Sequence, residues 1–157
     1  MNEFEIINHY FRQAHPATAP DLVLGIGDDA AILSVPNDAE LLLSMDTLVA
    51  GVHFLPEANP GDIGWKSLAV NISDMAAMAA EPRWISLALT LPEYDEQWLS
   101  GFADGFNQLA AEQGLILVGG DLTRGPLSIT VQIHGLVPKG QALRRSGARP
   151  GDSICVS

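Results

Sequence analysis

Five aspartates stand where apolar segments of the sequence end. Asp28 and Asp29 lie side by side in "LGIGDDAAIL", Asp46 ends "ELLLSMD", Asp74 lies in "VNISDMAAM", and Asp121 ends "LILVGGD". An unpaired carboxylate is costly at the boundary of an apolar core. Convergence on a hard cation would remove that cost, and Mg²⁺ prefers oxygen ligands, usually a few carboxylates completed by substrate phosphates. The pattern therefore indicates a magnesium site that serves phosphate chemistry.

A simpler explanation exists for each aspartate taken alone. Asp is a common turn residue at strand ends, so the pair at 28–29 fits a turn, and Asp46 and Asp121 fit strand-end turns. Asp74 fits a helix residue bonded to Asn71. Taken together, and with no Lys or Arg beside most of them, the aspartates favour the metal site.

Other phosphate and metal motifs are absent from the sequence or incomplete. "GIGDDA" matches the first half of a dinucleotide-binding fingerprint, but it lacks the third Gly and has acids where the pyrophosphate would lie. No G-x-x-x-x-G-K-[ST] segment occurs, so a P-loop is excluded. The four histidines are too scattered for a histidine-based metal site, and the aspartates are too widely spaced for an EF-hand.

Composition and charge limit the classes of partner. The chain has 157 residues, 47% of them apolar, which is enough for one domain with a core. A formal net charge of −11 disfavours broad contact with nucleic acid or an anionic membrane. Cys155 is the single cysteine, and neither a signal peptide nor a membrane span is evident. We expect a cytoplasmic protein that contacts phosphates through metal ions.

Helices alternate with strands along the sequence. Short apolar runs ended by Gly, Asp or Pro predict strands at 22–27, 40–46, 85–91, 115–121 and 127–137. Apolar spacing predicts helices at 62–80 and 95–114, with Asp62 and Asp95 as N-caps. The first of these helices also carries a polar stripe, so we expect it to be buried on two sides. The pattern predicts an α/β (α+β) sandwich in which helices pack on a sheet.

The two ends of the chain are less regular. A short amphipathic helix is predicted at 3–12, with Phe4, Ile7 and Phe11 on one face. The segment 138–152 predicts a loop that holds four of the eight basic residues. The last residues, "GDSICVS", have the pattern of a strand with no turn after it. We therefore expect that the chain has been cut from a longer one.

Five motifs in one order resemble a known family. They are "GIGDDAA", "DTLVAGVHF", "KSLAVNISDMAAM", "GGDLTRGPLSITVQIHG" and "RRSGARPGD", and they resemble the thiamine-monophosphate kinases over essentially the whole chain. The resemblance implies the N-terminal domain of the aminoimidazole-ribonucleotide-synthetase superfamily. Residues 1–157 would then form one domain with a mixed sheet that binds ATP and magnesium. Its sheet would join that of a second subunit in a homodimer, and a C-terminal domain would follow.

The resemblance also implies a set of site residues. Position by position, the family's magnesium ligands match Asp29, Ser44, Met45, Asp46, Asp74 and Asp121, and Asp28 is left unassigned. Met45 stands where relatives usually have Thr, so its contact would survive through a main-chain carbonyl and be lost if a hydroxyl is required. His53 matches the contact to thiamine monophosphate. The ATP contacts match Gly120, Asp121 and Arg145.

The reaction implied by the resemblance is the ATP-dependent conversion of thiamine monophosphate to thiamine diphosphate, by direct in-line transfer assisted by several Mg²⁺ ions. The second pKa of a phosphate monoester is about 6, so this acceptor needs no strong general base. We expect His53 to orient the acceptor. Two alternatives remain open: another ATP-dependent enzyme of the superfamily, such as aminoimidazole ribonucleotide synthetase or selenophosphate synthetase, and a non-catalytic divalent-cation-binding module.

Overall fold

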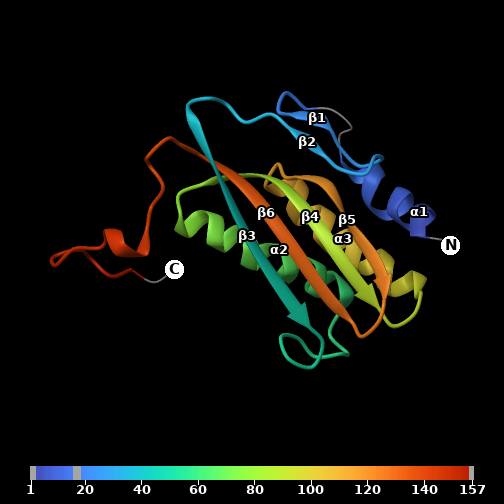
Figure 1. The fold of residues 1–157 in the computed structure, drawn as a ribbon. Coiled ribbons are helices and arrows are strands. Elements are labelled where there is room, and N and C mark those ends of the chain that lie inside the picture. The colour runs from blue at the N-terminus through green and yellow to red at the C-terminus, as the bar shows by residue number, and fades with distance from the viewer. Residues whose placement is uncertain (1–2, 16–18, 156–157) are drawn as a thin grey trace.

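A four-stranded mixed sheet forms the centre of the computed structural model, which describes residues 3–15 and 19–155 (Figure 1). Its strands lie in the order β3-β6-β4-β5. β4 and β5 are parallel, and β6 runs antiparallel to β3 and to β4. The bounds are β3 Ala39–Val49, β4 Glu81–Leu91, β5 Ile116–Arg124 and β6 Ser128–Pro138. The four strands predicted from residue 40 onward are therefore confirmed, each with ends shifted by a few residues, and so is the α/β fold class.

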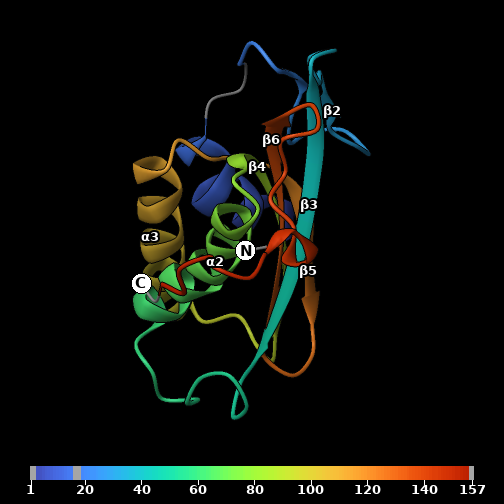
Figure 2. The same ribbon diagram turned by 90° about the vertical axis from the view of Figure 1, so that its left-hand side faces the viewer.

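Two helices, α2 (Pro60–Ala77) and α3 (Glu96–Glu112), cover one face of this sheet (Figure 2). Asp95 caps α3 as predicted, accepting hydrogen bonds from the N–H groups of Gln97 and Trp98. The predicted cap of α2 is wrong. Asn59 caps this helix by accepting from the N–H of Gly61 at 2.8 Å, and Asp62 lies inside the first turn.

The core lies between the helices and the sheet. Alternate residues of β4 and β6 point into it, and four of them are at most 5% exposed: Ile85, Leu87, Ile129 and Val131. From α3, Phe102 and Phe106 fill the space above them. The predicted burial of α2 on two sides is also confirmed, since α2 packs both on α3 and on the sheet.

Glycines let α2 and α3 approach each other closely. A Cβ on Gly64 would collide with the backbone oxygen of Phe102, and a Cβ on Gly105 would collide with that of Gly61. No side-chain movement could relieve either collision, because both partners are helix backbone. The two helices therefore act as one layer.

A second small sheet covers one end of the opposite face. β1 (Leu22–Leu24) pairs with β2 (Ile32–Leu33), and Leu22 packs with Trp84, Val118 and Leu136 of the large sheet. The strand predicted at 22–27 is thus three residues long, and β2 was not predicted. The remainder of this face is turned away from both helices, and we call it the open face.

The N-terminal segment is helical but changes type along its length. An α-helical turn, α1 (Glu3–Ile6), is followed by a π-helix, η1 (Ile7–Phe11), and a 3₁₀ turn, η2 (Arg12–Ala14). A π-turn shifts the phase of the helix, so the predicted inward face is confirmed at Phe11 and wrong at Phe4, while Ile7 is half-buried. Ile6, Tyr10 and Phe11 are buried, whereas Phe4 is 76% exposed.

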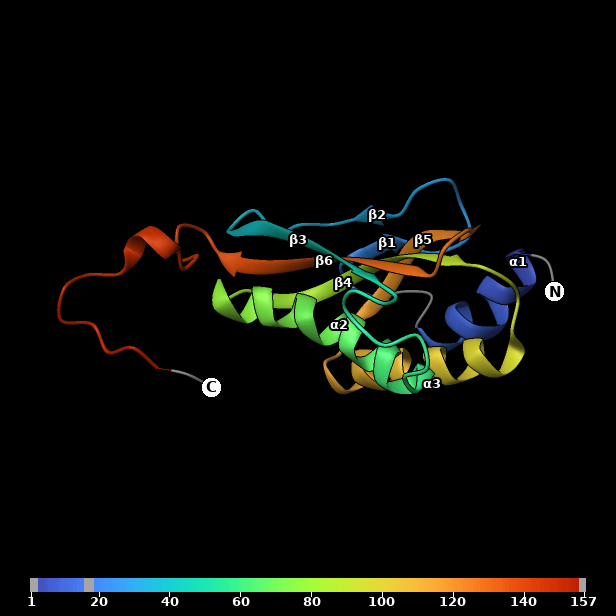
Figure 3. The same cartoon turned by 90° about the horizontal axis from the view of Figure 1, so that it is seen from below.

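After β6 the chain leaves the sheet and extends away from it (Figure 3). The predicted loop contains one 3₁₀ turn, η3 (Arg145–Gly147). The strand expected at the end of the chain does not form over residues 151–155, and its last two residues lie outside the described part. Among the described residues, no helix has the length and hydrophobicity needed to cross a membrane.

Candidate functional site

The structure brings Asp28, Asp29, Gly120 and Asp121 to one cavity of about 700 Å³. Four parts of the chain form its walls: the N-terminal helical segment, the loop at 26–31, residues 86–89 of β4, and residues 117–122 of β5. Two of the predicted magnesium ligands, Asp29 and Asp121, and two of the predicted ATP contacts, Gly120 and Asp121, are therefore close together. The loop between β1 and β2 and the strand β5 determine their positions.

Local backbone geometry explains why this cavity contains Asp28 and Gly120. The carboxylate of Asp28 accepts a hydrogen bond from the N–H of Asp29 at 2.8 Å, so Asp28 stabilises the turn and leaves Asp29 as the candidate ligand. Gly120 has φ +154° and follows a bulge in the pairing of β4 with β5. A Cβ at Gly120 would collide with the backbone oxygen of Leu87, so only glycine fits here.

The wall formed by the N-terminal segment is held by a chain of hydrogen bonds through His15. The N–H of Leu117 donates to His15 Nδ1 at 3.3 Å, so His15 Nε2 carries the proton and donates to Asn107 Oδ1 at 3.2 Å. Asn107 Nδ2 then donates to the main-chain oxygen of Tyr10 at 2.8 Å. Burial lowers the pKa of His15, which favours this neutral form. The network joins the segment that carries Arg12, a lining residue of the cavity, to α3 and β5.

A second group of predicted residues lies at the other edge of the sheet. Ser44 on β3 donates from its hydroxyl to Asp74 Oδ2 on α2 at 2.6 Å. Both residues line a cavity of about 840 Å³, together with Arg144 and Arg145 from the loop after β6. Two predicted metal ligands and the predicted ATP contact Arg145 are thus neighbours. Arg144, which was not predicted, adds a second positive charge.

Side-chain alternation along β3 separates the three consecutive predicted ligands. Ser44 faces α2, and Asp46, two residues further along the strand, shares that face. The side chain of Met45 points to the open face and is 62% exposed. A thioether is a soft ligand that suits magnesium poorly, so only the main-chain oxygen of Met45 could serve as a magnesium ligand.

A buried amide lies one helical turn before Asp74. Asn71 is fully buried, and its Nδ2 donates to the main-chain oxygen of Ser67 at 3.0 Å. Its Oδ1 has no hydrogen-bond partner among the described residues. A buried polar atom of this kind normally has a partner, so Asn71 adds a free oxygen acceptor on the helix that carries Asp74.

His53 lies in neither cavity. It follows β3 in a tight turn, where its Nδ1 accepts a hydrogen bond from the N–H of Val49 at 3.0 Å. Lys66 on α2 donates from its ammonium to the main-chain oxygen of His53 at 2.7 Å. Sequence reasoning singled out His53 but missed Lys66, because their contact joins a turn to a separate helix. It also missed Arg12 as a lining residue of the first cavity, because the cavity is formed by segments far apart in the chain.

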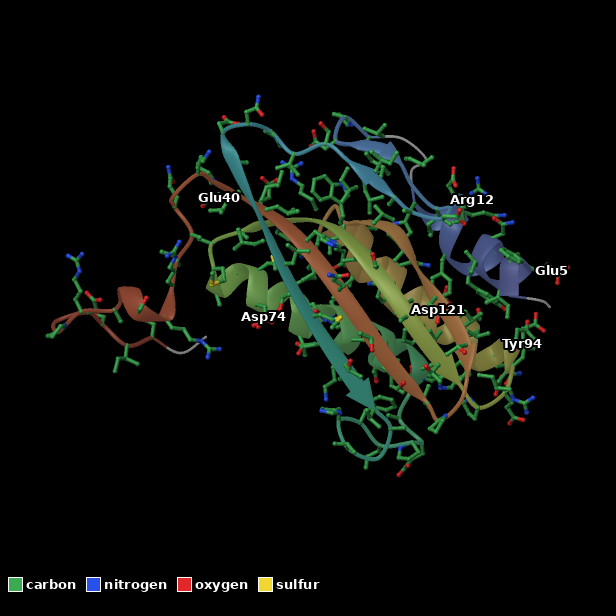
Figure 4. All side chains as sticks on the ribbon, in the orientation of Figure 1. Glu5, Arg12, Glu40, Asp74, Tyr94 and Asp121 are labelled. Atoms are coloured by element: carbon green, nitrogen blue, oxygen red, sulfur yellow. The ribbon has the colours of Figure 1, made fainter. Side chains whose placement is uncertain are left out.

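One chain does not bring the predicted ligands together at a single point. Across the sheet, Asp46 on β3 is aligned with Val131, Leu87 and finally Gly120 on β5. Three strand spacings separate the two edges, which is about 14 Å. Figure 4 shows Asp74 and Asp121 on different sides of the molecule. Within residues 3–15 and 19–155, no three His, Cys, Asp or Glu side chains gather closely enough to hold a metal ion.

Comparison with known proteins gives consistent matches. The N-terminal domain of the AIR synthase related proteins matches residues 27–137. The thiamine-monophosphate kinase of Escherichia coli (strain K12) is 54% identical over 155 residues, which are 99% of this chain and 47% of that protein. The crystal structure of thiamine-monophosphate kinase from Stenotrophomonas maltophilia K279a has 50% identity and a TM-score of 0.81, covering 92% of this chain and 45% of that one.

A third match is a structure of AaThiL complexed with AMPPCP and TMP. It has 27% identity and a TM-score of 0.68, and it covers 94% of this chain and 45% of that one. The chain spans about half the length of the curated relatives it matches.

Proposed function

Because the chain belongs to the AIR synthase related protein family, which it matches over residues 27–137, we propose that it forms the N-terminal domain of a thiamine-monophosphate kinase. The whole enzyme would transfer the γ-phosphoryl group of ATP to thiamine monophosphate, yielding ADP and thiamine diphosphate. The observation that carries this proposal is the 54% identity to the Escherichia coli kinase across 99% of the chain. The complex of AaThiL with AMPPCP and TMP supports the two substrates.

The donor atoms of the two groups suit magnesium. Carboxylates, a hydroxyl and main-chain or amide oxygens are the ligands that Mg²⁺ prefers, and the unpartnered Oδ1 of Asn71 is an oxygen of this kind. We propose that magnesium is held by Asp29, Ser44, Asp46, Asp74 and Asp121, with the main-chain oxygen of Met45. Bound magnesium would neutralise phosphate charge and align the in-line transfer.

The chain's own residues would do the remaining work of binding. Arg145 would place positive charge beside the nucleotide phosphates, in a chain whose net charge is −11. Gly120 would contact the nucleotide through its main chain, and β4 leaves no room for a side chain there, since a Cβ would collide with the Leu87 backbone oxygen. His53 would orient thiamine monophosphate, whose phosphate is already largely ionised and needs no base.

A homodimer would explain why the ligands are divided between two edges of the sheet. On β3, Leu41, Leu43 and Met45 are 37%, 55% and 62% exposed on the open face, and such a row is typical of a surface that becomes covered. If two open faces pack about a two-fold axis that runs along the strands, β3 of one copy lies over β5 of its partner. Ser44 and Asp74 lie on the helix-covered side of β3, but β3 is an edge strand. We propose that each site forms around this edge and combines the Ser44–Asp74 group of one copy with the Asp29–Asp121 group of the other.

The test uses the full-length enzyme with ATP, Mg²⁺ and thiamine monophosphate, and measures thiamine diphosphate. Asp74→Asn and Asp121→Asn are each expected to lower kcat by at least about a hundredfold, because each removes charge that holds metal against the reacting phosphates. Asp104→Asn, an exposed aspartate of α3, is the matched control and should retain wild-type turnover. Retained activity with unchanged Mg²⁺ dependence in Asp74→Asn and Asp121→Asn would contradict the ligand assignment, and a wild-type enzyme that makes no thiamine diphosphate would contradict the function.

Mixing the two inactive variants tests the shared site. In a heterodimer of Asp74→Asn with Asp121→Asn, one of the two composite sites contains neither substitution. Random mixing should therefore restore about a quarter of wild-type activity. If each site were built within one chain, no intact site would form and the mixture would stay inactive. We also propose a cytoplasmic location, which the single exposed thiol at Cys155 supports.

A further inference from the structure

The turn that carries His53 is closed by its own backbone. The N–H groups of Val52 and His53 both donate to the Val49 oxygen, at 3.1 and 2.9 Å, and the N–H of Gly51 donates to the Phe54 oxygen at 2.8 Å. Phe54 packs against the main core. Residues 49–54, which we call the His53 turn, therefore have a defined shape at the end of β3.

Within this turn the imidazole of His53 has a defined tautomer. Val49 donates its N–H to Nδ1 at 3.0 Å, so Nδ1 must hold a lone pair, and the proton of the neutral ring is on Nε2. Nε2 is then a hydrogen-bond donor. It has no lone pair with which to take a proton from a substrate.

Lys66 ties the His53 turn to α2. Its ammonium donates to the main-chain oxygen of His53 at 2.7 Å. In the described part of the chain the one ion pair joins Arg83 to Glu81, so the charge of Lys66 is not used to neutralise a carboxylate. α2 also carries Asp74, and the contact therefore sets the distance between the His53 turn and the helix that holds a proposed metal ligand.

From these contacts we propose that Lys66 is the positioning residue for His53, and that His53 serves as a hydrogen-bond donor from Nε2 to an acceptor atom of the substrate. Lys66 acts through the main-chain oxygen of His53, and the Val49 N–H fixes which ring nitrogen donates. The consequences for turnover rest on the proposed kinase function. The geometry of the imidazole does not.

The first measurement is independent of activity. Full-length protein labelled with ¹⁵N-histidine is compared by imidazole ¹H–¹⁵N correlation spectra, and the His53 signals are assigned from their loss in His53→Asn. Wild type is expected to show a single Nε2–H tautomer for His53. Lys66→Met should lose this single tautomer, whereas Lys66→Arg, which retains a charged donor, should keep it. Lys139→Met is the matched control, because Lys139 is exposed and its ammonium makes no hydrogen bond within the described residues.

The second measurement is steady-state kinetics of the same variants. Lys66→Met should raise KM for thiamine monophosphate roughly tenfold with little change in kcat, the size expected for one charge-assisted hydrogen bond. Lys66→Arg should restore most of the loss. Lys66→Gln serves as a second variant should Lys66→Met fail to fold.

Three outcomes would overturn the proposal. The first is a wild-type His53 that carries its proton on Nδ1, and the second is a Lys66→Met or Lys66→Gln protein that retains both the wild-type tautomer and the wild-type KM. The third is a Lys66→Met or Lys66→Gln protein with a raised KM and an unchanged tautomer. The last would mean that Lys66 contacts the substrate itself. Failure of wild type to phosphorylate thiamine monophosphate would refute the kinase function, and the spectra would still decide the role of Lys66.

Discussion

Replacing Gly64 with Ala tests how tightly the helix layer is packed. An added Cβ would collide with the Phe102 oxygen and approach the Phe106 nitrogen to 3.0 Å. To regain normal contact, α2 and α3 must separate by roughly 1 Å. Such overpacking costs about 1–3 kcal/mol, and we expect about 2–3 kcal/mol here because the collision is with helix backbone. The better helix propensity of Ala returns about 1 kcal/mol. We expect a net loss near 1–2 kcal/mol, or about 2–8 °C in Tm for a domain of this size.

Thermal unfolding followed by circular dichroism measures this loss. Gly147→Ala is the control, because a Cβ there meets nothing within 4 Å, and it should leave Tm unchanged. Gly105→Ala separates the same two helices through the Gly61 oxygen, so the double variant should cost less than the two single losses added. A Gly64→Ala protein as stable as wild type, or additive losses in the double variant, would refute the close contact of the two backbones.

Two further predictions concern stability. Burial lowers the pKa of His15 below 6.5 in the folded state. Just below pH 6.5 the unfolded chain therefore binds more protons than the folded chain does. The stability contributed by neutral His15 is lost as pH falls through that range. His15→Asn should flatten the acid side of a plot of unfolding free energy against pH, leaving the part due to His134, whose pKa burial also lowers; an unchanged slope would contradict this. Asn59→Ala should lower the free energy of unfolding, measured in urea, by about 1 kcal/mol because it removes the α2 cap. Asp62→Ala should lower it by no more than a few tenths of a kcal/mol, the share of the helix dipole. Equal losses would be inconsistent with Asn59 as the cap.

Periodicity in the sequence was sufficient to predict most of the elements. The strands from residue 40 onward and the Asp95 cap of α3 were predicted because their signals are local. The inward face of the N-terminal helix was predicted only in part, at Phe11, since a π-turn changes the phase and leaves no mark in composition. Asn59 was missed as a cap because Pro60 starts the helix two residues before the expected position. β2 has two residues and depends on contact with β1.

For the site, residue type could be predicted but grouping could not. Asp at the end of several apolar runs indicated metal chemistry, and the contact of Ser44 with Asp74 is consistent with it. Which aspartates lie together depends on the strand order, and the insertion of β6 between β3 and β4 has no signal in a single sequence. Asp46 and Asp121 are therefore at opposite edges, and their ligand roles stay predictions.

The position of β6 also has a consequence for folding during synthesis. β6 is the last strand of this sheet to leave the ribosome, yet it lies between β3 and β4. It pairs with β3 along its whole length, from Ala39 with Pro138 to Val49 with Ser128. Until residue 138 has emerged, only β4 and β5 have each other as partners, and β3 presents unpaired backbone on both edges. Pairings so distant in the chain form slowly. The nascent domain is therefore most open to aggregation late in its synthesis, when nearly all of its apolar surface has been made and the strand that closes the sheet is still missing.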